Sequence, residues 1–68
     1  MSAVVTNIED LSHGVTYEVL LQSGERFRGQ LATVGNRSAF GTFARFDLAD
    51  GKQRSEHAVD FESATPVT

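Results

Sequence analysis

Residues 15–34, VTYEVLLQSGERFRGQLATV, contain two runs of alternating apolar and polar residues on either side of Ser23-Gly24. Such alternation is typical of strands with one buried face, and a short glycine-containing break between two such runs favours a hairpin turn. The stretch therefore predicts a β-hairpin in a half-buried sheet. The residues expected to face inward are Val15, Tyr17, Val19, Leu21, Phe27 and Leu31.

A second hairpin is expected further along the chain. Residues 39–49 alternate in the same way, and the Asp50-Gly51 dipeptide that follows is a strong turn signal because both residue types tolerate a left-handed backbone. Residues 52–61 then form the last long strand, which begins polar and turns apolar side chains inward near its end. The inward residues expected in this half are Phe40, Phe46, Val59 and Phe61.

The remaining segments are short. Residues 1–6 are expected to be either frayed or a short added strand, and residues 7–11 one helical turn with Asn7 as its N-cap. Residues 35–38 predict a turn or loop, with a positive φ at Gly35. Residues 63–68 are expected to form a short edge strand or a frayed tail, because Pro66 has no N–H to donate to a central ladder.

A chain of 68 residues makes one domain, residues 1–68, near the lower size limit for a single hydrophobic core. Gly29 and Gly41 fall inside predicted strands, where glycine usually marks a bulge, a bend or a close backbone approach. We therefore expect an all-β fold, a small bent five-stranded antiparallel barrel of SH3-like type. Oligomerisation is a natural way to stabilise so small a core.

The glycine spacing of the first hairpin resembles the first signature of the Sm-like (Lsm/Hfq-type) small β-barrels, over about residues 15–34. That resemblance implies five bent strands after a short N-terminal helix, and an oligomer that binds RNA. The second Sm signature has no counterpart in residues 52–61, where Arg54 is followed by Ser55. A similar small barrel occurs in the Rof-type Rho-binding antiterminators, which are acidic like this chain. The residues that match the signature are Val19, Leu21, Gly24, Phe27, Gly29 and Leu31.

Charge is segregated along the chain. Residues 1–25 contain four acidic residues and no Lys or Arg, residues 26–45 contain four arginines and no acid, and the whole chain has a net charge of −3. If successive strands pair as neighbours, acidic and basic strands lie side by side, and Glu18 can pair with Arg26 or Arg28. The alternative is that the arginines gather into one electropositive patch for a phosphate backbone or an acidic protein.

The segment 37–46, RSAFGTFARF, interleaves arginine with phenylalanine, a composition found in strands on which RNA bases stack. Strict alternation places Phe43 on the face opposite Phe40 and Phe46. Phe43, beside Arg45, is therefore expected either to be an exposed stacking platform or interface anchor, or to pack under the N-terminal turn. The candidate binding surface consists of Arg26, Arg28, Arg37, Phe43, Arg45 and Arg54.

Catalysis has little support. His13 and His57 are the only histidines, and without cysteine or a paired-histidine spacing they do not suggest a metal site. The glycines lack the following helix that a phosphate-binding loop requires. The chain is expected to be a non-enzyme with no cofactor, metal or small-molecule substrate.

Three functions stay open. The first is a small regulatory module that contacts a partner protein, or another copy of itself, through an edge strand or the Arg/Phe face. The second is an Sm-like ring in which edge strands join protomers and the arginines face single-stranded RNA. The third is a structural subunit of a phage or mobile-element assembly. The lack of cysteine and of an apolar N-terminal signal favours a cytoplasmic protein without membrane contact.

Overall fold

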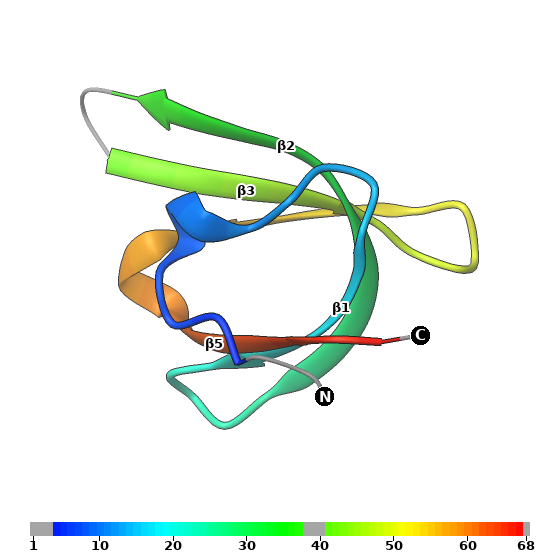
Figure 1. Cartoon of the computed structure of the whole chain (residues 1–68), viewed down its shortest axis with the longest axis horizontal. Coiled ribbons are helices and arrows are strands. Elements are labelled where there is room, and N and C mark those ends of the chain that lie inside the picture. Colours follow the sequence, from blue (N-terminus) through cyan, green and yellow to red (C-terminus); the bar gives the residue numbers. More distant parts are fainter. Residues whose placement is uncertain (1–3, 38–40, 68) are drawn as a thin grey trace.

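Five antiparallel strands form one strongly bent sheet in the order β4-β3-β2-β1-β5 (Figure 1). The computed structural model describes residues 4–37 and 41–67. The fold is the expected small, bent, five-stranded antiparallel barrel of SH3-like type. Its elements are η1 (Ile8–Asp10), β1 (Thr16–Leu21), β2 (Arg26–Arg37), β3 (Gly41–Asp47), β4 (Gln53–His57), η2 (Ala58–Asp60) and β5 (Phe61–Pro66), where η denotes a single turn of 3-10 helix.

Both predicted hairpins are present. In the first, the Leu21 N–H donates to the Glu25 carbonyl at 2.9 Å, and Gly24 adopts a φ of 91°. In the second, the Leu48 N–H donates to the Lys52 carbonyl at 2.8 Å, with Gly51 at a φ of 87°. Glycine takes these left-handed conformations without the steric cost that a Cβ brings, so both turns form where the sequence predicts them.

The core lies on the concave side of the sheet. Phe46, Leu31 and Val19 are its largest fully buried side chains, and Phe27 packs edge-on against Phe46 with ring centroids 5.3 Å apart. These are residues that alternation assigned to the inner face. Other buried members are Ile8, Leu11, Tyr17, Leu21, Ala44, Phe61 and Ala64, with Val15 partly buried against them.

The bend in β2 depends on Gly29 and on a bulge. An ideal Cβ at Gly29 would lie 2.8 Å from the Phe46 Cβ, so the two strands approach more closely there than a side chain allows. The register then shifts between Leu31 and Thr33, which inserts an extra residue and turns Val34 inward, opposite Ala44. Gly29 therefore marks a close approach, as its position in mid-strand predicts.

The predicted turn is wrong for residues 35–37, and Ser38 lies outside the described residues. β2 continues to Arg37, and Gly35 lies in the strand opposite Phe43 without a positive φ. The reason is steric, because an ideal Cβ at Gly35 would be 2.7 Å from the Phe43 ring. The positive φ belongs instead to Gly41, at 76°, which begins β3 rather than lying in its middle. Phe40 is outside the described residues.

The last predicted strand is also divided. After β4 the chain makes the η2 turn, and Val59 is 77% exposed rather than inward, whereas Phe61 is buried as expected. The turn is fixed by Gln22, whose N–H donates to the Asp60 carbonyl at 2.8 Å and whose side-chain amide donates to the Phe61 carbonyl at 3.1 Å. Because η2 carries the chain from one edge of the sheet to the other, strict alternation ends there.

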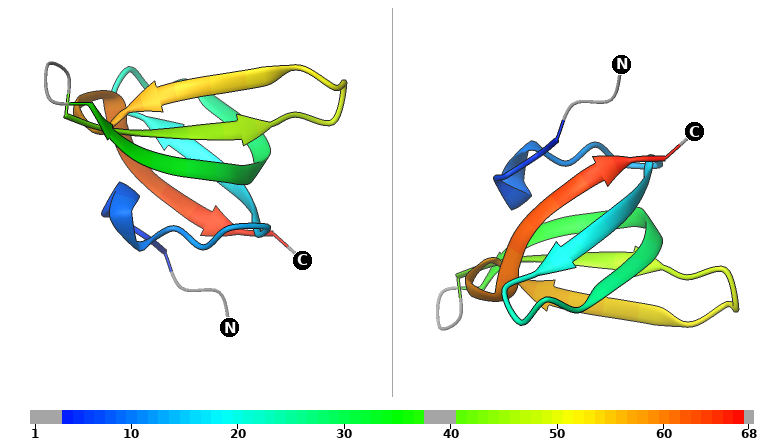
Figure 2. Two further views of the ribbon diagram at one scale, coloured as in Figure 1. Left: turned by 90° about the horizontal axis from the view of Figure 1, so that it is seen from above. Right: turned by 90° about the horizontal axis from the view of Figure 1, so that it is seen from below.

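The N-terminal segment lies along β5 (Figure 2). Asn7 caps η1 as predicted, with its side-chain oxygen accepting a hydrogen bond from the Glu9 N–H at 3.0 Å. The segment is tied to the barrel at Val5, which forms an isolated antiparallel bridge with Ala64, and at Tyr17, whose hydroxyl accepts a bond from the Ser12 N–H at 2.9 Å. Of the two alternatives for the N-terminal residues, the bridge at Val5 corresponds to a short added strand, and residues 1–3 lie outside the described residues.

Candidate functional site

Arg26 and Arg28 lie on the outer face of β2. The β1–β2 register places them opposite Leu20 and Glu18, which alternate with the buried side chains of β1. Arg28 forms the expected cross-strand ion pair, with its Nη2 3.6 Å from the Glu18 Oε1. Because both side chains are largely exposed, water screens the pair and it adds less than about 1 kcal/mol to stability.

Phe43 and Arg45 lie on the outer face of β3. Phe43 is half-buried rather than exposed, because its ring covers the space that a side chain at Gly35 would fill. Arg45 is exposed and lies between Thr33 of β2 and Ser55 of β4 in the register. Phe43 is thus half-buried on the outer face of β3, and its ring covers the outer surface over Gly35.

Arg54 differs from the other arginines because it lies on the inner side of β4, opposite Phe46. Its guanidinium carbon is 4.3 Å from the centre of the Phe27 ring. Its Nε donates to the Glu56 carboxylate at 2.6 Å, and its Nη2 lies 3.0 Å from the Glu25 carboxylate. Arg54 therefore links β4 to β2 by its cation–π contact with Phe27, and to the β1–β2 turn by its ion pair with Glu25, whereas its pair with Glu56 lies within β4.

These contacts determine how the Arg54 link responds to pH. The hydrogen bond to Glu56 raises the pKa of the Arg54 guanidinium, with Glu25 acting in the same direction and burial opposing both. A group with a raised folded pKa stabilises the fold at pH values below its ordinary pKa, provided that its carboxylate partners are ionised, and it loses that contribution as pH rises through the raised value. The charge on Arg54 is therefore constant throughout the neutral and moderately alkaline range.

Five of the six candidate residues can be placed, and Arg54 lies apart from the other four. Arg26 and Arg28 lie on the outer face of β2 before the bend, whereas Arg45 and Phe43 lie on β3 beyond it. Arg54 points to the inner side. Arg37 ends β2, and its side chain lies outside the described part of the structure.

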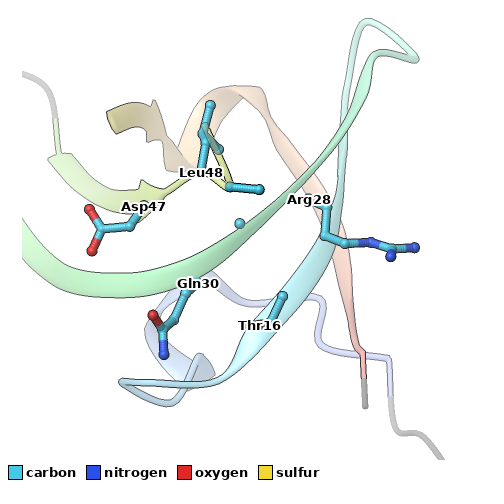
Figure 3. Close-up of a pocket in the computed structure, with 7 residues that line it drawn as sticks. Thr16, Arg28, Gln30, Asp47 and Leu48 are labelled. Carbon is cyan, nitrogen blue, oxygen red and sulfur yellow. The ribbon is translucent and has the colours of Figure 1, made fainter. Parts of the chain in front are cut away.

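A hollow of about 300 Å³ opens between the first hairpin and the β3–β4 turn (Figure 3). Gly29 and Leu48 contribute to its lining, with Thr16, Arg28 and Asp47 around them. The Arg28 guanidinium and the Asp47 carboxylate point in opposite directions. Sites for small molecules need polar groups that converge on the ligand, and these two diverge.

The two edges of the sheet differ in their backbone groups. The bond between Leu48 and Lys52 makes that pair a hydrogen-bonded one, and such pairs alternate along an antiparallel ladder. Arg54 and Glu56 therefore bond to β3, whereas Gln53 and Ser55 turn their N–H and C=O groups away from it. Among the described residues, none forms a backbone hydrogen bond with the N–H or C=O groups of Gln53 and Ser55 that point away from β3. The β4 edge is open.

The β5 edge is covered. Ala64 turns its backbone away from β1, and both of its groups bond to Val5, with N···O distances of 2.7 and 2.8 Å. Pro66, the next outward residue, has no N–H. Sequence reasoning identified Pro66 as an edge residue, but pairing between positions 5 and 64 is a long-range contact without a local signal. An open β4 edge is the feature of this surface that the sequence did not reveal.

The described part of the chain comprises residues 4–37 and 41–67. Within these ranges no cluster of three or more His, Cys, Asp or Glu is arranged to hold a metal ion, and no helix has the length and apolar character that crossing a membrane requires. The fold thus defines a small all-β domain whose β4 edge is available for pairing. Comparison with family models, with curated proteins and with solved structures returned no match for this chain.

Proposed function

We propose that this chain is a small, non-catalytic, cytoplasmic binding module with a regulatory role, and that it recognises a partner protein through the edge of β4. The observation that carries the proposal is that the β5 edge is covered whereas the β4 edge has unpaired backbone groups. Val5 and Pro66 cover β5, whereas Gln53 and Ser55 present unused backbone groups on β4. An extended segment of a partner adds to such an edge through main-chain hydrogen bonds.

Two further observations favour strand pairing over the alternatives. An RNA-binding ring joined edge to edge uses both edges of each protomer, and here Val5 already pairs with Ala64 on β5. Binding to a phosphate backbone benefits from arginines on one continuous face. In this chain Arg28 is paired with Glu18, and Arg54 is paired with Glu25 and Glu56.

The proposal is tested by affinity capture with three forms of the full chain: wild type, Ser55→Pro and Arg45→Ala. Proline at position 55 removes an outward N–H without removing a bond to β3, and edge strands tolerate proline for this reason. We expect a partner that wild type and Arg45→Ala retain and that Ser55→Pro loses by about tenfold or more, which corresponds to about 1.4 kcal/mol. Urea unfolding of each variant verifies that the barrel is intact.

A second readout locates the contact. Addition of the captured protein should slow amide hydrogen exchange at Gln53 and Ser55, since strand addition buries those N–H groups. A partner lost by Arg45→Ala but kept by Ser55→Pro would move the site to the Arg/Phe face. Salt-sensitive capture of single-stranded RNA by all three forms would favour the RNA-binding alternative instead.

A further inference from the structure

We propose that the strand which pairs with β4 is β4 of a second copy of this chain, in antiparallel orientation, with a two-fold axis at Ser55. This inference rests on the proposed function in one respect, which is that the β4 edge is the binding site. It adds the identity of a partner and the register of the contact. The result is a symmetric dimer with one continuous ten-stranded sheet.

The backbone pattern of β4 is self-complementary. Gln53 and Ser55 both turn their hydrogen-bonding groups outward. With the axis at Ser55, the two Ser55 residues face each other as a hydrogen-bonded pair, in which each N–H donates to the opposite carbonyl. Gln53 of one copy then lies opposite His57 of the other. A two-fold contact requires one surface to fit itself, and this strand meets that condition.

Charge favours the register centred on Ser55 over the registers centred one residue to either side. With the axis at Ser55, Arg54 of each copy lies directly opposite Glu56 of the other, on the same face of the sheet. Moving the axis by one residue toward the N-terminus places Arg54 against Arg54, and moving it by one toward the C-terminus places Glu56 against Glu56. Opposite charges across a strand pair stabilise it and like charges destabilise it.

The cluster that forms is compatible with the contacts inside each copy. Arg54 and Glu56 of one chain are already 2.6 Å apart. In the dimer the four charged groups alternate in sign around the axis, so each arginine has a carboxylate neighbour within its own strand and another across the interface. The Ser55 side chains lie on the opposite, outer face, where Ser55 is exposed.

The test is cysteine cross-linking, because the natural chain contains no cysteine. In a hydrogen-bonded antiparallel pair the Cα atoms are about 5.5 Å apart, a separation at which disulfides form. Ser55→Cys should therefore give a disulfide-linked dimer under mild oxidation. Gln53→Cys is the matched control, since it lies on the same edge and face. Its two cysteines would be four residues out of register, about 13 Å apart at about 3.3 Å per residue.

We expect at least about tenfold more cross-linked dimer from Ser55→Cys than from Gln53→Cys, because proximity within a defined register sets the rate. Light scattering of the wild-type chain should show a concentration-dependent rise from 7.4 kDa toward twice that mass. Equal cross-linking of the two variants would overturn the register. A wild-type chain that stays monomeric, together with a Ser55→Cys variant that gives no cross-link, would overturn self-pairing. In that case Ser55→Pro capture still reports separately on whether β4 binds another protein.

Discussion

At two glycines of β2, the space that a Cβ would need is filled by different kinds of atom. At Gly29 the nearest atom to an added Cβ is the Phe46 Cβ at 2.8 Å, and at Gly35 it is the edge of the Phe43 ring at 2.7 Å. A Cβ is fixed to its backbone and moves only if the strand moves. A half-buried ring can rotate away. Similar distances therefore imply different costs of substitution.

We expect Gly29→Ala to lower the free energy of unfolding by about 1–3 kcal/mol, the usual cost of overpacking a core. Gly35→Ala should cost less than about 1 kcal/mol, because the Phe43 ring can shift and alanine also reduces the entropy of the unfolded chain. Urea unfolding of both variants measures the difference. A Gly29→Ala protein as stable as wild type would show that the bend at β2 does not depend on this close approach.

The boundaries of the elements show which parts of the fold the sequence could predict. The first hairpin and the Asp50-Gly51 turn follow from local alternation and turn chemistry, and both are confirmed. The bulge between Leu31 and Thr33 has no glycine or proline at the extra residue, so alternation alone could not reveal that Val34 turns inward. The η2 turn likewise contains no glycine or proline. It forms because Gln22, far away in sequence, bonds to both Asp60 and Phe61.

Substitutions at Val59, within η2, and at Phe61, directly after it, test the placement of η2. Val59→Asn should change stability by no more than about 0.5 kcal/mol, since a side chain that is 77% exposed buries little surface. Phe61→Ala should cost about 3–5 kcal/mol, which is much of the stability expected for so small a domain. Thermal unfolding separates the two outcomes. A large loss for Val59→Asn would mean that this residue faces the core after all.

Over the whole molecule, the segregated charges meet across neighbouring elements. The acidic first segment pairs with the arginines that follow it through Glu18 and Arg28, and the β1–β2 turn pairs with β4 through Glu25 and Arg54. The interpretation of paired strands is thus confirmed for Arg28. Arg54 lies on the inner side of β4, apart from Arg26, Arg28 and Arg45 on the outer face. The candidate site was harder to predict than the fold, because it depends on which edge the chain's own N-terminal segment covers.

Val5→Pro tests that cover. The substitution removes the N–H that donates to the Ala64 carbonyl at 2.7 Å, and so it weakens the bridge that protects β5. Two uncovered edges per molecule should give species larger than a dimer, with a mass that grows with concentration in light scattering. Val5→Ala loses similar packing but keeps the N–H, and it should behave like wild type. A Val5→Pro protein of unchanged size would contradict the protective role of the bridge.

The bridge between Val5 and Ala64 also sets an upper limit on assembly. In polymer chemistry, a molecule with one reactive end couples once and then stops, whereas a molecule with two reactive ends grows without limit. With β5 covered at Ala64 by Val5, strand addition at that position of the edge is blocked. If two copies pair through β4 as proposed, growth from one β4 edge to the next β5 edge cannot follow, so addition of this kind stops at the dimer.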